Sequence, residues 1–579
     1  MSFFSQPEWS NFVHVISARP WHSFAYALKL SRLVLRRISN TLYIKLISRG
    51  HRKLKRWPEW LDDDIHEVAY SHADLFFPDY SLASKYCLTT VAPKLHFGMA
   101  DVEGYFSFHR WGDCFSAALA DEAVAASALN DALSWICNPP IKQDAAWEAY
   151  SSSERVANLC VMLSVHANLW RNLDIDEKKK IKIFLIESSR WITNHLEYYG
   201  IDNTNNHILN NARALVIAGV VLGDALLVER GLVVFSKMAH VLFQPSGFLR
   251  ERSSHYQCVV TNWLMDTVHF SRWIHLSNTS ACTARNELEE LSLRVIKATA
   301  ILVTAMSRVG TTFIGDISPD NHPVVTVMRL RYLYSDWFQE SEMEVDGYRD
   351  DWLFSAEHNS QLIMCGMPAQ YPFEYATHGH SDLGSFVWGF NRYPILVDAG
   401  RASYVADEMT KFQCGQMGHN TLTINGLPAL SDSLLKNGNW RPKPYCNATV
   451  NVDQKFPNGF TISHDGFSRI PNVKTHTRSV QILSDGLEVI DTLLGSGQVE
   501  VELYWHFAPG FNPHAHHLNL LSGAVYEVLI EEVASEVADI AWLTYPFSAA
   551  YGEVERAYMR CTKYSISLPW SVKTKMILI

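Results

Sequence analysis

The sequence predicts an α+β protein of several domains, in which a helical half precedes a half built from antiparallel strands. Between about residue 113 and residue 306, apolar residues recur at helical spacing, whereas after about residue 348 short β-branched and aromatic runs alternate with turn residues. At 579 residues the chain is long enough for two or three separate cores. We expect a basic arm at 1–60, a helical domain at 61–340 and an antiparallel β-sandwich at 341–579.

The helical half shows a series of amphipathic segments separated by Pro, Gly and Asn breaks such as Asn138–Pro139–Pro140 and Pro245–Ser246–Gly247. Each apolar stripe needs a neighbouring helix to cover it, which is typical of an α/α toroid or a helical array. No visible sequence repeat selects between these two arrangements. The expected helices are Cys114–Cys137, Ser153–Leu169, Glu177–Tyr199, His207–Leu222, Leu226–Phe243, Val259–Leu276 and Arg285–Met306.

The second half shows strand patterns without helices between them, and this indicates an antiparallel sandwich instead of a parallel sheet. Turn residues such as Asn391–Arg392 and Ser484–Asp485–Gly486 separate these strands. An acidic stretch within residues 335–350 marks the boundary with the helical half. The clearest expected strands are Ser385–Phe390, Ile395–Asp398, Ser479–Leu483, Leu487–Asp491 and Val499–Leu503.

Charge is distributed unevenly along the chain. The net charge is −10, but eleven Lys or Arg residues and a single acid precede Glu59, so the remainder carries −20. An acidic body argues against nucleic acid as a partner. It also means that a polyanionic substrate would need a local positive groove, which overall charge does not reveal.

The N-terminal arm lacks the order of residues that marks a cleavable signal peptide, and no apolar run has the length of a membrane span. Residues Phe24–Ile47 alternate apolar and basic side chains. This segment could lie on an anionic membrane surface as an amphipathic helix, or pack as a solvated helix on the main domain. The ten cysteines form no CxxC pair, so we expect most of them to be buried thiols.

Three polar clusters carry the candidate chemistry. Asn206 and His207 open an apolar helix, where backbone N–H groups favour an anion, although Asn there is also an ordinary helix cap. Tyr256 ends a charged loop between two helices. In the strand half, the run from His378 to Asp382 is followed by Asp398 and His419. His380, Asp398 and His419 together offer two imidazoles and one carboxylate, a combination that Zn²⁺ accepts, and hydrogen-bonded histidines at a sheet edge are the simpler alternative.

Together these motifs resemble the heparinase II/III-like polysaccharide lyases, and they occur in the same order along the chain, from about residue 100 to past residue 505. The matching motifs are Asn206–His207, Glu251-x-Ser253-x-x-Tyr256, His378-x-His380-x-Asp382-x-x-Ser385–Phe386, Asp398-x-Gly400 with Tyr404, and His419–Asn420–Thr421. Trp147–Glu148 with Arg155 and Gly315–Asp316 add shorter similarities. Gln257 and Lys411–Phe412 depart from the family pattern, which leaves the substrate class open.

The resemblance implies an incomplete (α/α) toroid followed by an antiparallel β-sandwich, with the active site in the cleft between them. It further implies cleavage of an acidic, uronate-containing polysaccharide by β-elimination in a periplasmic or secreted setting. By this resemblance, Asn206 and His207 bind the uronate carboxylate, and Tyr256 and His378 act as acid and base. Arg155, Glu251 and Tyr404 are expected to bind substrate, and His380, Asp398 and His419 to hold a structural Zn²⁺.

Two alternatives remain open from the sequence. A glycoside hydrolase on a helical toroid would need two facing carboxyl groups, for which Glu148 and Glu251 are candidates. A non-catalytic glycan-binding or assembly factor in exopolysaccharide production would fit the basic arm and the lack of a signal peptide. The sugar, the endo or exo mode of cleavage, and the oligomeric state do not follow from the sequence.

Overall fold

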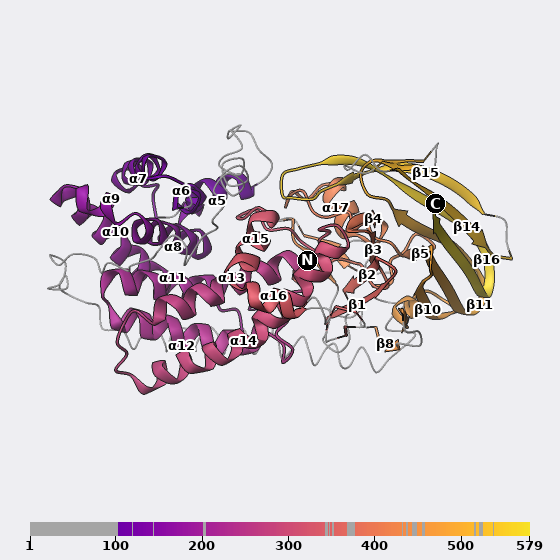
Figure 1. Cartoon of the computed structure of the whole chain (residues 1–579), viewed down its shortest axis with the longest axis horizontal. Coiled ribbons are helices and arrows are strands. Elements are labelled where there is room, and N and C mark those ends of the chain that lie inside the picture. Colours follow the sequence, from indigo (N-terminus) through magenta and orange to yellow (C-terminus); the bar gives the residue numbers. More distant parts are fainter. Residues whose placement is uncertain are drawn as a thin grey trace, which may run out of the picture.

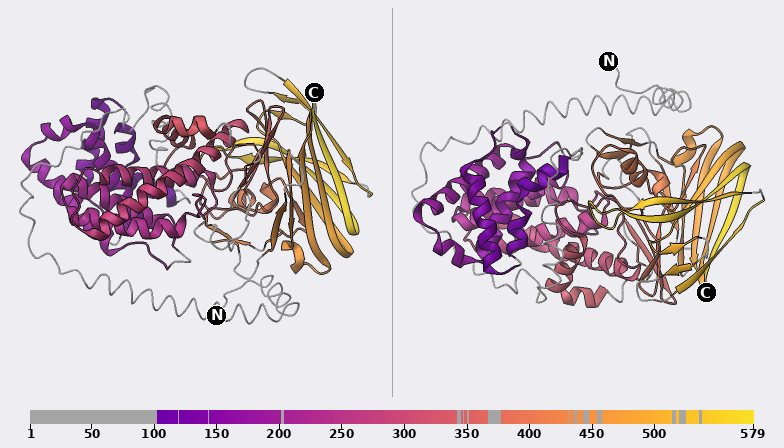
Figure 2. Two further views of the ribbon diagram at one scale, coloured as in Figure 1. Left: turned by 60° about the horizontal axis from the view of Figure 1, so that its bottom comes forward. Right: turned by 90° about the horizontal axis from the view of Figure 1, so that it is seen from above.

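The computed structural model describes residues 102–579, apart from residues 119, 143, 201–203, 342–344, 347, 350–351, 367–376, 431, 436–437, 443–447, 454–457, 514–516, 520–524 and 536–537. The expected basic arm at 1–60, with its amphipathic segment, lies outside the described residues. In the described part, helices gather at one end of the molecule and strands at the other (Figures 1 and 2). This confirms a helical region followed by antiparallel sheets, while closure of the helices into a toroid stays a prediction.

The helices of the first region match most of the expected segments to within a few residues. Cys114–Cys137 divides in two, because Asp121 caps a new helix with its side chain. The bounds are α5 (Val102–Arg110), α6 (Gly112–Ala118), α7 (Glu122–Cys137), α8 (Ala149–Val165), α9 (Ala167–Asn172), α10 (Ile175–Asn194), α11 (His207–Leu222), α12 (Ala225–Leu242), α13 (Ser254–Ser271), α14 (Thr279–Arg308), α15 (Pro323–Leu333) and α16 (Ser335–Ser341).

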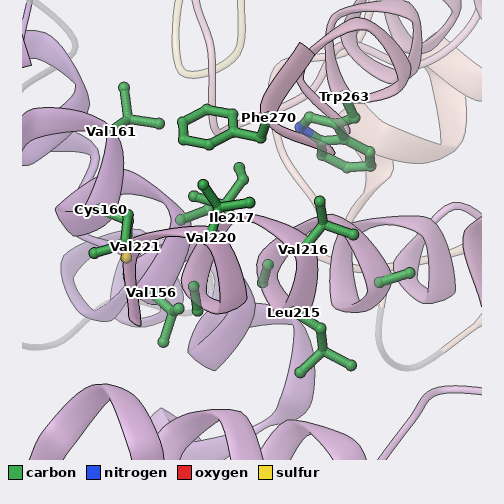
Figure 3. Packing of buried hydrophobic residues seen from close by; sticks show 14 of the residues in the cluster. Val156, Cys160, Val161, Leu215, Val216, Ile217, Val220, Val221, Trp263 and Phe270 are labelled. Carbon is green, nitrogen blue, oxygen red and sulfur yellow. The ribbon is translucent and has the colours of Figure 1, made fainter. Parts of the chain in front are cut away.

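Helix α11 is the centre of the helical core. It contacts α8, α12 and α13, and all of its residues after His207 are buried. Figure 3 shows aliphatic side chains of α8 and α11 packed beneath Trp263 and Phe270 of α13. Because a buried apolar face fixes each helix against its neighbours, the N-terminal ends of α8, α11 and α13 are held in a constant arrangement.

Two large antiparallel sheets of the described strand region share one hydrophobic core, as the layers of a sandwich do, and β6 and β7 form a separate two-stranded sheet. A four-stranded sheet has the order β1-β2-β3-β4, and a ten-stranded sheet has the path β12-β13-β14-β16-β11-β10-β9-β8, with β15 paired to β16 and β5 to β11. The bounds are β1 (Leu353–His358), β2 (Gln361–Gly366), β3 (Val387–Phe390), β4 (Tyr393–Leu396), α17 (Glu408–Cys414), β5 (Leu422–Ile424), β6 (Asp432–Leu434), β7 (Trp440–Pro442), β8 (Val450–Asp453), β9 (Gly459–His464), β10 (Val473–Ile482), β11 (Gly486–His506), β12 (Phe511–Asn512), β13 (His517–Asn519), β14 (Val525–Val533), β15 (Asp539–Phe547) and β16 (Glu555–Leu578).

The two strands expected at Leu487–Asp491 and Val499–Leu503 are parts of one strand, β11. The Gly495–Ser496–Gly497 segment between them resembles a turn in sequence. In the structure it forms an irregularity in the pairing with β16, where the register shifts between Leu493 and Gly497. Glycines with positive φ allow this bulge without ending the strand.

No described helix is long and apolar enough to cross a membrane. Cysteines 114, 160, 258, 365, 414 and 561 are buried free thiols, as expected for the described members of the set, whereas Cys137 is exposed.

The helical and strand regions meet where α14 ends against the β3–β4 hairpin. A side chain added at Gly389 would lie 2.5 Å from the Cα of Val309, and one added at Gly310 would lie 2.3 Å from Pro394. Such distances are far below van der Waals contact, so the junction depends on backbone-to-backbone approach.

We expect Gly389→Ala to destabilise the protein by about 1–3 kcal/mol, because the new methyl group must displace backbone at the junction. A lower melting temperature in calorimetry would show this. Gly112→Ala is the matched control, since nothing lies within 4 Å of the added carbon there. Equal melting temperatures for the two variants would contradict the role given to the junction.

Candidate active site

The candidate site forms where three helices begin. Tyr150 lies in the first turn of α8, His207 is the first residue of α11, and Tyr256 lies in the first turn of α13. The rings of Tyr150 and His207 are 4.5 Å apart. Since the N-terminal end of a helix carries a partial positive charge, this convergence favours an anion.

Backbone hydrogen bonds join the helical loops to the strand region at this point. The amide of His378 donates to the carbonyl of Glu251, and the amide of Asp316 donates to the carbonyl of His378. Gly315, with φ of +79°, lies so close to both chains that a side chain there would be 2.8 Å from the carbonyl oxygens of Arg252 and His378. The loop containing His378 is thereby fixed against the start of α13.

Asn206, Tyr256 and His378 form one continuous group. The Asn206 side-chain nitrogen is 3.0 Å from Nε2 of His378. The rings of Tyr256 and His378 are stacked with centroids 3.6 Å apart and planes inclined by 8°. The structure therefore brings three of the four residues singled out as catalytic into contact, whereas the side chain of His207, the next residue after Asn206, contacts Glu197 and Tyr150.

Asn206 stands at the N-cap position of α11, but its side chain does not cap the helix. Its Nδ2 donates to Glu251 (2.7 Å) as well as facing His378, and its backbone N–H donates to the other oxygen of Glu251 (2.8 Å). Because Nδ2 can only donate, Nε2 of His378 must accept, and the His378 proton then lies on Nδ1. The second imidazole nitrogen, Nδ1, faces Asp316 at 2.9 Å.

Asp316 is the hub of the site, and sequence reasoning did not select it as a site residue. One carboxylate oxygen contacts His380 (2.9 Å) and Arg401, and the other contacts His378 (2.9 Å) and the phenol of Tyr404 (3.2 Å). Burial favours a raised pKa for Asp316, but Arg401 and the two histidines outweigh burial and hold its pKa well below the usual range. Asp316 is therefore an anion that fixes four side chains.

The two tyrosines form a chain of hydroxyl groups that ends at this carboxylate. The phenol oxygens of Tyr256 and Tyr404 are 3.1 Å apart, and Tyr404 donates to Asp316. Burial raises the pKa of Tyr256 well above its ordinary value, and nearby carboxylates add to this effect. Burial and Asp316 likewise raise the pKa of Tyr404. Both phenols are protonated at neutral pH.

His207 differs from the rest of the group because its side chain is 35% exposed. Its Nδ1 lies 2.8 Å from Glu197. Burial lowers the pKa of His207, but the Glu197 carboxylate more than compensates and raises it to about 9. His207 is thus a cation at neutral pH that a ligand can reach.

His380, Asp398 and His419 lie together at the edge of the strand region, with one potential ligand atom from each within 4.8 Å of the others. Nδ1 of His380 and Nε2 of His419 are buried and have no hydrogen-bond partner. Unpartnered buried nitrogens are costly unless something binds them, so these residues fit a metal ion. Asp316, His380 and Cys414 form a second such group, but Arg401 beside Asp316 disfavours a cation there.

Two of the residues expected to bind substrate are enclosed by the protein instead of being open to a ligand. Arg155 is fully buried, donates to the backbone oxygens of His109 (2.6 Å) and Ala146 (3.2 Å), and lies 4.3 Å from the Trp135 ring. A guanidinium so enclosed does not contact a ligand, so we withdraw the expectation for Arg155. The Glu251 side chain is 1% exposed, and it holds Asn206 instead of lying open to substrate.

Residues 352–552 match the family model described as heparinase II/III-like, C-terminal. No curated protein sequence matches the chain. Among solved structures, a heparinase III has a TM-score of 0.64 at 12% identity, with 95% of this chain and 91% of that chain covered. A second heparinase III has a TM-score of 0.58 at 14% identity and covers 89% and 86%.

A heparan sulfate lyase from Pedobacter heparinus is similar with a TM-score of 0.50 at 15% identity, covering 93% of this chain and 87% of that chain. At such low identities these likenesses concern the fold. Residues 352–552 thus match a heparinase II/III-like C-terminal domain, and the overall fold of the chain is similar to that of the heparinases.

Proposed function

We propose that this protein is a polysaccharide lyase that cleaves a uronate-containing glycan by β-elimination. The observation that carries the proposal is a buried protonated tyrosine with a histidine stacked on its ring, beside a helix start that bears an accessible cationic histidine. The likeness to heparinases and to a heparan sulfate lyase supports the same reaction class.

The reaction removes the proton on C5 of the uronate, forms a C4=C5 double bond and breaks the bond from C4 to the glycosidic oxygen, which takes up a proton. Removal of the C5 proton requires that the carboxylate charge be neutralised. His207 supplies a positive charge for this, and the helix starts around it add partial positive charge.

The hydrogen bonds of the site support His378 as the base and Tyr256 as the acid. His378 carries its proton on Nδ1 toward Asp316, so Nε2 is the basic nitrogen. In the described geometry Asn206 donates to that nitrogen. A substrate carboxylate that draws the Asn206 amide hydrogen to itself would free Nε2 to take the C5 proton, and Asp316 would stabilise the imidazolium that forms.

Tyr256 is the acid, because its raised pKa keeps it protonated and its phenol can deliver a proton to the departing oxygen. Tyr404 and Asp316 continue the hydroxyl chain from which Tyr256 is supplied. Since the rings of Tyr256 and His378 are stacked, we place acid and base on one face of the sugar. Syn elimination suits glucuronate or mannuronate, whereas galacturonate, iduronate and guluronate require anti elimination.

We further propose that His380, Asp398 and His419 hold a structural Zn²⁺. Nε2 of His380 faces Asp316, so metal binding through Nδ1 would give the common arrangement in which a carboxylate orients a ligand histidine. The metal site and His378 would then share Asp316. In this proposal the ion fixes the loop that carries the base and takes no part in proton transfer.

The hydrolase alternative loses support from the surroundings of its two candidates. The Glu251 side chain is enclosed and accepts two hydrogen bonds from Asn206, and Glu148 accepts from Arg110 and Ser151. Neither is a free acid facing the other across a sugar. A glycan-binding role without catalysis is distinguished by the first experiment below.

Tyr256→Phe should lower the rate at which a new ultraviolet absorbance appears on uronate glycans by about 10²- to 10⁴-fold, the usual contribution of a general acid. The ring still stacks on His378, and the lost hydroxyl forms a hydrogen bond with Tyr404, so the melting temperature should change little. Tyr564→Phe is the control, because that phenol donates to Glu532 on another strand. A fully active Tyr256→Phe enzyme would contradict the proposed mechanism.

Glu197→Gln should move the alkaline limb of the pH profile of kcat/KM downward. Without the carboxylate, the pKa of His207 falls from about 9 toward its ordinary value near 6.5, so His207 loses its charge at pH 8. We expect kcat/KM to be about 10- to 100-fold below wild type at pH 8 and much closer to it at pH 5.5. Glu289→Gln, which removes an exposed ion pair with Arg272, is the control. An unchanged pH profile of kcat/KM would contradict the role of His207 as the cation that neutralises the substrate carboxylate.

His419→Ala should reduce the zinc that copurifies with the protein from about one ion per chain to a small fraction, as measured by elemental analysis. Zinc added to metal-depleted wild-type protein should raise its melting temperature, because an ion that binds only the folded state stabilises it. His195→Ala, at an exposed position, should leave both results unchanged. Zinc-free wild-type protein that is insensitive to added zinc would contradict the proposal.

A further inference from the structure

A pocket opens in the helical region, next to the candidate active site but separated from it by an ion pair. The pocket is lined by α8, α11, α13 and α15 together with the α5–α6 segment. Arg110 and Asp320, which are 2.7 Å apart, form the wall on the catalytic side. Tyr150 donates to Asp320 (2.6 Å), and its ring lies 4.5 Å from that of His207. A ligand in the pocket is thus one side chain away from the proposed carboxylate site.

The charges in this pocket are compensated within the protein. Arg213 pairs with Glu154 (3.1 Å), and Arg329 pairs with Asp266 (2.6 Å). Arg110 is shared among Asp320, Glu103 (2.8 Å) and Glu148 (3.3 Å). A sulfate or carboxylate entering the pocket would meet these carboxylates and would have to break buried ion pairs to reach an arginine. The pocket is therefore unsuited to an anion.

Two polar atoms of the lining are buried and lack a hydrogen-bond partner. They are Oδ1 of Asn262, an acceptor, and Nε of Arg213, a donor. Nε of Arg213 is 3.8 Å from Asp266, which is too long for a hydrogen bond. Both residues line the pocket. An unpartnered donor and an unpartnered acceptor at one site match hydroxyl groups, which both donate and accept.

Aromatic side chains complete the lining. Phe108, which is 55% exposed, offers the accessible ring, and the nearly buried Trp263 and Trp111 line the pocket with small parts of their surface. The C–H faces of a pyranose ring pack against such side chains, while its hydroxyl groups reach amides and ion-paired residues. This combination is characteristic of sites for uncharged sugars.

We propose that this pocket binds an uncharged sugar residue. Resting on the proposed function, the sugar is a unit of the same glycan chain as the uronate, which makes the substrate a glycan with neutral residues beside its uronates. Asn262 and Arg213 contact its hydroxyl groups, and the Arg110–Asp320 pair divides the neutral subsite from the charged one.

Binding can be measured without any lyase reaction, by ligand-observed NMR and tryptophan fluorescence on the full-length protein. The probes are glucose, galactose, mannose and xylose, with glucose 6-sulfate as the charged probe. We expect saturable binding of at least one neutral sugar and at least tenfold weaker binding of the sulfate. Absence of saturable binding, or equally tight binding of the sulfate, would overturn the proposal.

Variants localise the signal to the pocket. Asn262→Ala should weaken neutral-sugar binding at least fivefold, and Ser107→Trp, which fills the pocket from a half-exposed position on α5, should abolish it. Asn172→Ala, at an exposed position, is the matched control and should bind as wild type. Binding that survives both pocket variants would overturn the proposal. A protein that binds the sugar but produces no absorbance on any uronate glycan would contradict the lyase function alone.

Discussion

The structure of the candidate site depends on one buried carboxylate, that of Asp316. An isolated carboxylate in such a place would become protonated, and Asp316 stays ionised because Arg401 and two histidines surround it. The same contacts work in the other direction, since the charge of Asp316 fixes the tautomer of His378 and orients His380 and Tyr404. A single side chain from the loop after α14 thereby couples the proposed base, the hydroxyl chain and the proposed metal site.

Asn206 illustrates how the protein departs from the simplest local structure to build this site. An Asn at the start of a helix ordinarily caps it, but here the side chain donates to Glu251 and faces His378. In the first turn of α11 the His207 amide donates to the side chain of Asn205 instead, and the Asn206 amide faces the imidazole of His378. The His207 side chain, one residue later, is 35% exposed. Under the proposed function, the Asn206 amide would position the base and the His207 cation would bind the carboxylate.

Much of the fold followed from local sequence signals, and the failures have identifiable physical causes. Helix α11 begins and ends at the expected bounds, His207 and Leu222, whereas the Gly495–Ser496–Gly497 segment resembled a turn although it is a bulge within β11. Motif residues of the site could be named from their order along the chain. Asp316 could not be recognised as a central site residue from the sequence, because its importance lies in contacts with residues 62 to 88 positions away. Arg155 was misjudged because backbone carbonyls and a stack of tryptophan rings can enclose a guanidinium without any acid or ligand.

The chain is acidic and the proposed substrate is an anion. The positions of the protein's cationic side chains explain how the two can be compatible. Around the site, Arg110, Arg401 and His207 each face carboxylates of the protein, so the described part of the cleft does not present a broad positive surface of the kind that attracts polyanions. The His207 side chain remains partly exposed, so it can bind one substrate carboxylate at a time. Under the proposed function, such a protein would bind one uronate at a defined position, with an uncharged sugar in the neighbouring pocket. Dense sulfation of the glycan would then add no favourable contacts and would bring negative charge close to the carboxylates of the site.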